Sequence, residues 1–96
     1  MRFRVRYTPE AAAIIRNQAP EVKTAIRRGI DELIKDPLLG KELQEELEGF
    51  RSHRVRRYRI IYQVNEAGPW LAVFYIGPRR DVYQAFSELL LDNRES

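Results

Sequence analysis

The 96-residue chain contains no cysteine and a single histidine, His53. Without cysteine the protein has no disulfide framework and no thiolate to serve as nucleophile or metal ligand. One histidine cannot build the His-rich sites that hold zinc and related metals. We therefore expect a protein that works without a metal or another cofactor.

Long apolar runs are also missing. No segment approaches the ~20 consecutive apolar residues that span a bilayer. The first ten residues alternate charged and apolar side chains, unlike the continuous apolar stretch of a signal peptide. We expect a cytoplasmic protein without a membrane partner, folded as one domain over residues 1–96.

Acidic residues are absent from residues 49–64, the segment GFRSHRVRRYRIIYQV. Five arginines stand there instead, at positions Arg51, Arg54, Arg56, Arg57 and Arg59. Like charges on neighbouring strands repel one another, so an anionic partner is the natural explanation for them. The acids gather elsewhere, with seven of them in residues 31–48. This segregation favours a basic face that binds nucleic acid, the alternative being a solvated sheet without a ligand.

Hydrophobic periodicity and turn residues divide the chain into seven main elements. Strands are predicted at residues 2–7, 50–55, 58–64 and 70–76, and helices at 9–17, from 20 to the Asp36-Pro37 stop, and after Asp81. Thr8 and Asp81 are N-cap residues by type and position. Residues 38–48, with leucine at every fourth position, favour at most a short amphipathic helix.

The order β-α-α-β-β-β-α predicts an α+β fold with a small, mostly antiparallel sheet. We expect the first two helices to form an αα-hairpin on one face of the sheet, with Gly29 letting the first helix approach closely. The opposite face should then be basic, concave and open. The strand at 70–76 is apolar on both sides, so it should lie inside the sheet.

Alternation along the strand at 58–64 separates two sets of side chains. The core face receives Tyr58, Ile60, Tyr62 and Val64, and the other face receives Arg59, Ile61 and Gln63. Because an unpaired charge on a central strand is costly, a buried ion pair is the structural alternative for Arg59. His53 alternates opposite to Arg54, which favours a packed or rim histidine over a catalytic one.

Several strings of the sequence resemble one family. They are GKEL at 40–43, LEGFR at 47–51, RVRRYRIIY at 54–62 and GPRRDVY at 77–83. Together they look like the RelE/ParE superfamily of toxins from bacterial and archaeal toxin–antitoxin pairs, over nearly the whole chain. The resemblance implies a cognate antitoxin and a toxin–antitoxin hetero-oligomer. RelE-like members cut mRNA in the ribosomal A site, whereas ParE-like members poison DNA gyrase.

The resemblance also implies which residues act. Metal-free RNA cleavage needs a base for the ribose 2′-OH, cations around the phosphate and an acid for the departing 5′-oxygen. Carried over from RelE-like members, these roles fall on Arg54, Arg59, Arg79 and Tyr83. The remaining basic residues of the segment and of the GPRRDVY string are expected to bind RNA, namely Arg51, Arg56, Arg57 and Arg80.

The sequence departs from the family pattern in two places. Arg56-Arg57 replaces the usual Gly-Asp or longer glycine loop, which predicts a turn without positive φ at these residues. Arg54 stands where the family uses lysine, and arginine keeps the charge but stays protonated at any working pH.

The leading hypothesis is therefore a ribosome-dependent endoribonuclease that inhibits translation. The main alternative is a gyrase inhibitor without chemistry of its own. A third reading is a basic RNA-binding module whose catalytic residues have been lost.

Overall fold

A computed structural model describes residues 3–65, 67–78 and 80–95, and the side chains up to residue 92. The elements are β1 (Arg4–Tyr7), α1 (Pro9–Arg16), α2 (Pro20–Lys35), β2 (Lys41–Glu42), the 3₁₀ helix η1 (Glu45–Leu47), β3 (Arg51–Val55), β4 (Tyr58–Asn65), β5 (Trp70–Pro78) and α3 (Val82–Glu95). The α+β fold and its predicted order are confirmed, with β2 and η1 as additions.

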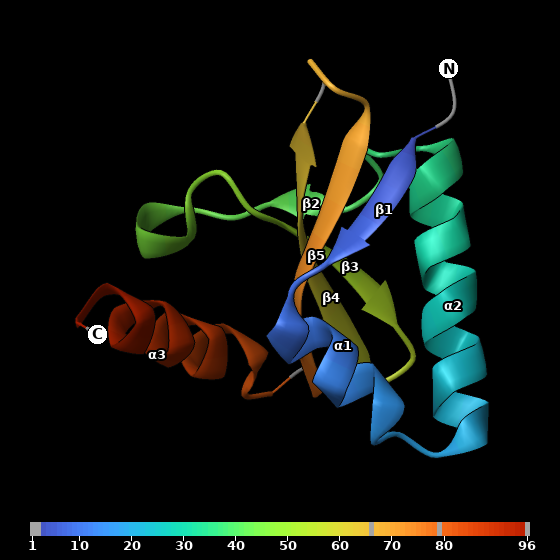
Figure 1. Cartoon of the computed structure of the whole chain (residues 1–96), viewed down its shortest axis with the longest axis horizontal. Coiled ribbons are helices and arrows are strands. Elements are labelled where there is room, and N and C mark those ends of the chain that lie inside the picture. Colours follow the sequence, from blue (N-terminus) through green and yellow to red (C-terminus); the bar gives the residue numbers. More distant parts are fainter. Residues whose placement is uncertain (1–2, 66, 79, 96) are drawn as a thin grey trace.

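The five strands form one sheet in the order β1-β5-β4-β3-β2 (Figure 1). Strand β1 pairs with β5 in parallel, and the other neighbours are antiparallel. Strand β4 lies at the centre, and β5 lies inside the sheet as its two apolar faces predict.

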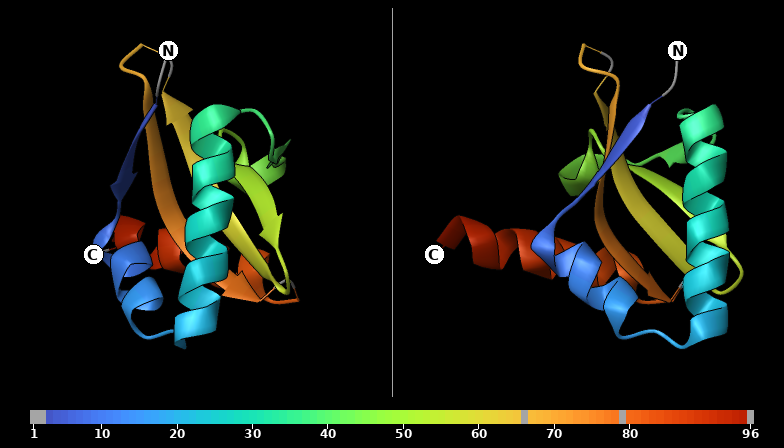
Figure 2. Two further views of the ribbon diagram at one scale, coloured as in Figure 1. Left: turned by 90° about the vertical axis from the view of Figure 1, so that its right-hand side faces the viewer. Right: turned by 45° about the vertical axis from the view of Figure 1, so that its right-hand side comes forward.

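Helices α1 and α2 cover one face of the sheet, while α3 projects from the other (Figure 2). Thr8 caps α1, because its side-chain oxygen accepts a hydrogen bond from the Ala11 amide. The core beneath α1 and α2 contains Ile26 and Leu33 from α2, and Ile60 and Tyr62 from β4. The predicted alternation along β4 therefore holds.

Gly29 faces the sheet and not α1, so the expectation of a close α1 approach was wrong. A Cβ at this position would collide with Val55 of β3 and would stand 3.3 Å from Ile60 Cδ1. The glycine is thus what lets the middle of α2 lie directly on β3 and β4, at the propensity cost of about 1 kcal/mol that a mid-helix glycine carries.

The face opposite α1 and α2 is not open along its whole length, which corrects the expected open concave surface. It carries a second apolar cluster, in which Phe86 of α3 packs edge-on against Phe50 with ring centres 4.9 Å apart. Phe50 also meets Phe74 of β5, with ring centres 5.1 Å apart. Burying Phe86 alone stabilises the fold by about 1.5–3 kcal/mol. The apolar stripe of α3 is therefore used mainly to attach the helix to the sheet.

Residues 38–48 do not form the short amphipathic helix. Leu38 and Leu39 are 56% and 47% exposed, and the segment continues into the short strand β2 and then η1. The tertiary structure captures this backbone: the Tyr62 hydroxyl donates to Pro37 O at 2.8 Å and accepts from the Gly40 amide at 3.0 Å. Contacts with a distant strand override the local leucine spacing.

The β3–β4 turn contradicts the prediction of negative φ, because Arg56 has a φ of +53°. A two-residue connection has to match the right-handed twist of its strands, which calls for a left-handed residue at the turn. Without glycine at this position the strain of that conformation remains, at about 1–2 kcal/mol.

Candidate functional site

Arg54 on β3 and Arg59 on β4 stand directly opposite each other in the antiparallel register. Cross-strand partners share a face of the sheet, and both belong to the face from which α3 projects, which we call the site face. On its other side Arg59 pairs with Gly77 of β5, which has no side chain to cover it. We refer to Arg54 and Arg59 as the arginine pair.

Arg59 carries an unsatisfied donor. Its Nε atom is buried and has no hydrogen-bond partner among the described residues. Such an orphaned donor costs about 1–3 kcal/mol, so Arg59 is an unfavourable residue for stability at this position. A phosphate oxygen is well matched to a guanidinium because the two bind in a planar, two-bond geometry.

The arginine pair also lacks an acidic partner within the described part of the chain. Arg51 pairs there with Glu42 at 3.1 Å, and the His53 ring is hydrogen-bonded to Glu32 at 3.2 Å; neither contact includes the arginine pair. The buried ion pair that would explain Arg59 structurally is thus not found among these residues. The local positive field is therefore left for an external anion.

Tyr83 lies in the first turn of α3 and points to the site face. Its hydroxyl is 3.1 Å from the hydroxyl of Ser52, which precedes Arg54 by two residues on β3. The same strand parity therefore places Tyr83 and the arginine pair on one face. Val82, the residue before Tyr83, would contact a Cβ at Gly77, the neighbour of Arg59.

Two residues near Tyr83, Ser52 and Lys41, were not predicted from the sequence. Ser52 is 1% exposed, and Lys41 Nζ is 5.9 Å from the centre of the Tyr83 ring. Ser52 could have been found from its spacing to Arg54 along one strand. Lys41 could not, because its segment did not read as a strand.

Arg51 lies on the opposite face from the arginine pair. It pairs with Tyr62 in the register, and its guanidinium donates to Gly40 O and Leu38 O at 3.0 Å each and to Glu42 at 3.1 Å. These acceptors use its donors to hold the loop before β2. The structure therefore does not bring Arg51 together with the other expected RNA-binding residues.

The other expected residues lie around the end of the sheet where β3 meets β4. Arg56 and Arg57 form the exposed turn, and Arg80 is exposed just before α3. Arg54 Nε donates to Arg56 O at 3.3 Å, which ties its side chain to that turn. Arg79 lies outside the described residues. His53 points away from the site face toward Glu32 of α2, as the strand alternation predicts.

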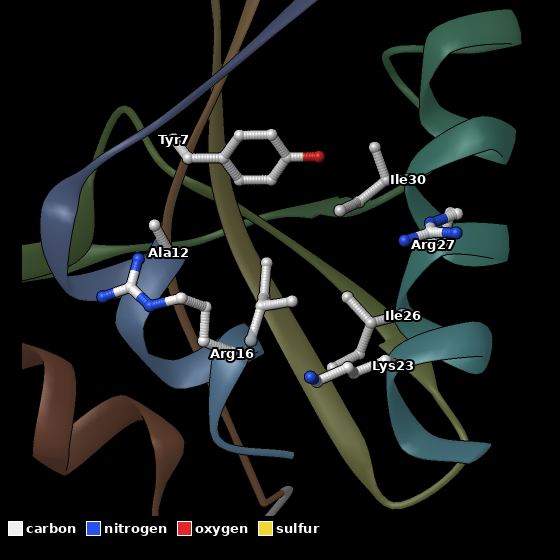
Figure 3. A pocket seen from close by; sticks show the side chains of 8 residues that line it. Tyr7, Ala12, Arg16, Lys23, Ile26, Arg27 and Ile30 are labelled. Carbon is white, nitrogen blue, oxygen red and sulfur yellow. The ribbon is translucent and has the colours of Figure 1, made fainter. Parts of the chain in front are cut away.

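A separate pocket of about 220 Å³ lies between α1, α2 and β1, on the far side of the sheet (Figure 3). Ile26 and Ile30 give it an apolar wall, and Arg16, Lys23 and Arg27 are at its rim. Tyr7 is 45% exposed and reaches across toward α2. Burial raises the pKa of Tyr7 above 10.0, although Arg27 opposes the shift.

Among the described residues, no group of three His, Asp or Glu side chains is placed to hold a metal ion. None of the described helices combines the length and the apolar character that a membrane span needs. The site face offers two arginines from adjacent strands, further exposed cations and a tyrosine hydroxyl. This set can bind a phosphodiester, and the hydroxyl can give a proton to a departing oxygen.

Comparison with known proteins points to one family. A family model described as the ParE toxin of the type II toxin-antitoxin system, parDE, matches residues 5–83. Toxin RelG of Mycobacterium tuberculosis is 28% identical over 86 residues, covering 88% of this chain and 99% of RelG.

Solved structures of toxin–antitoxin complexes share the fold. The RelBE2 complex of Mycobacterium tuberculosis matches with a TM-score of 0.76 and 26% identity, over 82% of this chain and 100% of that one. The E. coli RelBE complex matches with a TM-score of 0.69 and 18% identity, over 81% and 96%. The chain therefore belongs to the ParE toxin family of type II toxin–antitoxin systems, within the RelE/ParE superfamily.

Proposed function

We propose that this toxin is a metal-independent endoribonuclease that cleaves mRNA in the ribosomal A site. The observation that carries the proposal is the arginine pair, with its orphaned Arg59 Nε and no acidic partner among the described residues, on the same face as Tyr83. A surface that only docks on another protein gains nothing from a buried donor without an acceptor, such as Arg59 Nε. Arg59 as a whole is only partly buried, so the outer part of its guanidinium can hold a phosphate group through a reaction.

The reaction needs only the chain, the RNA and solvent water. The 2′-oxygen of one ribose gives its proton to a water molecule and attacks the neighbouring phosphorus, and the bond from phosphorus to the 5′-oxygen breaks. The products are a 2′,3′-cyclic phosphate and a free 5′-hydroxyl. Arg54 and Arg59 bind the non-bridging oxygens, where negative charge grows in the transition state. Tyr83 delivers the proton that the 5′-oxygen requires.

The surrounding cations have a simpler role. Arg56, Arg57 and Arg80 are exposed and bind flanking phosphates, which steers RNA to the site without reading its sequence. Arg79 belongs to this proposal on the strength of the resemblance alone. We leave Arg51 out, because its donors are committed to the loop before β2.

Gyrase inhibition is the second candidate, and the description of the matching family model as a ParE toxin favours it. On that reading the basic surface docks on gyrase, and Tyr83 serves only to attach α3. The two candidates differ in whether the toxin changes RNA covalently.

The test compares the two targets directly. Purified toxin is added to ribosomes programmed with a defined mRNA, and separately to gyrase acting on relaxed plasmid DNA. We expect cleaved mRNA bearing a cyclic phosphate end, and normal supercoiling. Intact mRNA together with blocked supercoiling or gyrase-linked DNA breaks would overturn the proposal in favour of the second candidate.

A cognate antitoxin is the partner that the toxin–antitoxin complexes among the structural neighbours support. We propose that it binds beside α3, where Leu47, Leu90 and Leu91 line a mostly apolar groove of about 500 Å³ that also includes Tyr83. A partner helix in that groove would cover Tyr83 while its acidic side chains neutralise the site face. The pocket of Figure 3 is the competing location, since it too joins an apolar wall to a cationic rim.

A further inference from the structure

Lys41 and Ser52 lie side by side next to Tyr83. The register pairs Lys41 of β2 with Ser52 of β3, so both side chains belong to the site face. We propose that they are parts of the cleavage site: Ser52 is the positioning residue for the Tyr83 hydroxyl, and Lys41 adds a cation beside its ring. This inference rests on the proposed endoribonuclease function.

Ser52 occupies a place where an apolar side chain would be expected. It is 1% exposed and stands opposite Ile61, which belongs to the apolar cluster under α3. A hydroxyl at such a position is costly unless it is hydrogen-bonded. The Tyr83 hydroxyl, at 3.1 Å, is the partner that the described residues provide. The buried serine thus fixes one atom of a residue that reaches the surface.

The direction of that bond matters for the chemistry. When Ser52 donates to the Tyr83 oxygen, the Tyr83 proton stays free for the departing 5′-oxygen of the RNA. After this proton moves, the phenolic oxygen carries a negative charge and still accepts from Ser52. A donor already in place stabilises that charge without having to reorganise.

Lys41 supplies a positive charge, opposite to the negative charge of the Tyr83 phenolic oxygen. Its ammonium nitrogen is 5.9 Å from the centre of the Tyr83 ring, and its side chain is exposed. The adjacent Glu42 points to the other face and is paired there with Arg51. Strand alternation therefore directs the carboxylate of its sequence neighbour away from Lys41.

A purely structural role would also explain the contact, because Ser52 would then only attach α3 to the sheet. The two roles differ in their readouts. Attachment of α3 affects the melting temperature, whereas positioning affects the rate of cleavage once RNA is bound.

The experiment measures single-turnover cleavage of ribosome-bound mRNA by wild-type toxin, Ser52→Ala, Lys41→Gln and Lys41→Arg. Lys35→Gln is the matched control, since Lys35 is an exposed lysine at the end of α2. We expect Ser52→Ala and Lys41→Gln to lower the saturating rate about 10- to 100-fold, toward the lower end of acid–base contributions. The half-saturating concentration and the melting temperature should stay near wild type. Lys41→Arg should recover most of the rate.

A double-substitution series tests whether both residues act through Tyr83. In a Tyr83→Phe background, Ser52→Ala and Lys41→Gln should lower the residual rate no further, because residues that act as a unit are not additive. Full effects in that background, wild-type rates in the single variants, or an equal loss in Lys35→Gln would overturn the inference. If wild-type toxin does not cleave mRNA at all, both the proposed function and this inference are wrong.

Discussion

Arg59 is unfavourable for stability at its position, and its proposed role is to bind the phosphate of the RNA. Its buried Nε is left without a partner among the described residues, beside a second arginine on the next strand. Both features oppose folding. A substitution that removes the charge and keeps the length of the side chain should therefore separate the two properties.

We predict that Arg59→Met lowers mRNA cleavage about 10²–10³-fold, as expected when a preorganised donor to developing charge is lost. Stability to urea should hold or rise by about 1 kcal/mol, since the substitution removes an orphaned donor. Arg28→Met, at an exposed position of α2 on the opposite face of the sheet, is the control and should retain the cleavage. A variant of Arg59 that unfolds would show that its role is structural.

Tyr62 has the opposite character, because its hydroxyl is used for structure. It donates to Pro37 O at 2.8 Å and accepts from the Gly40 amide at 3.0 Å. We predict that Tyr62→Phe destabilises the protein by about 1–3 kcal/mol, the cost of leaving these backbone groups unpaired. Urea denaturation measures the change, with Tyr58→Phe as the control on the same strand. Equal stability of the two variants would mean that water replaces the hydroxyl.

The same tyrosine makes stability depend on alkaline pH. Burial raises the pKa of Tyr62 above its ordinary value of 10.0, although hydrogen bonds from Gly40 and Arg51 oppose the shift. The folded state then holds this proton more tightly than the unfolded chain does. The contribution of protonated Tyr62 to the free energy of unfolding is complete below pH 10, and it is lost as the pH rises through the pKa of Tyr62 in the folded state. We predict that the stability advantage of wild type over Tyr62→Phe narrows above pH 10, as followed by urea denaturation at a series of pH values. An advantage that is constant up to the alkaline limit of folding would contradict this assignment.

At the scale of elements, the sequence predicted what local chemistry determines. Helix α1 begins where Thr8-Pro9 places it, and α2 ends before Pro37. Strands β4 and β5 follow from their alternation and their apolar runs. The strand β2 was not predictable, because it consists of two residues whose pairing depends on β3. The sequence indicated Arg54, Arg59 and Tyr83 as site candidates. It did not indicate Lys41, because this residue lies on β2.

The loop before β2 depends on the absence of a side chain at Gly40. A Cβ there would stand 2.7 Å from both Ser52 O and the Tyr62 hydroxyl. Since one of these atoms is backbone in a sheet, it cannot move aside cheaply. We predict that Gly40→Ala destabilises the protein by about 1–3 kcal/mol, the usual cost of overpacking. Thermal denaturation beside Leu39→Ala, a change at an exposed neighbour, provides the measurement. A Gly40→Ala variant as stable as Leu39→Ala would mean that the loop is free to move away.

At the scale of the whole molecule, the sheet separates two surfaces with different character. One face bears the arginine pair and the groove beside α3, and the other bears α1, α2 and the pocket of Figure 3. Which of the two receives the antitoxin decides whether inhibition covers the site directly or acts from the far side.

We predict that Leu91→Asp weakens antitoxin binding at least ~10-fold, because a carboxylate in an apolar groove costs more than 1.4 kcal/mol of affinity. Leu91 is 55% exposed, so its substitution should leave the fold intact. Arg27→Glu, at the rim of the other pocket, is the matched variant and should bind as wild type does. Titration calorimetry with the purified antitoxin compares the two. Tight binding by Leu91→Asp and loss of binding in Arg27→Glu would move the docking site to the α1–α2 side.

The parallel pairing of β1 with β5 has a consequence for the order in which the toxin folds. β1 is synthesised well before the strand that it joins, since Arg4 pairs with Trp70. A contact between such distant segments forms late, because closing a long loop is entropically unfavourable. Arg59 likewise gains Gly77, its neighbour on β5, only once β5 has formed. The sheet around Arg59 is therefore completed only after β5 has been synthesised and has paired.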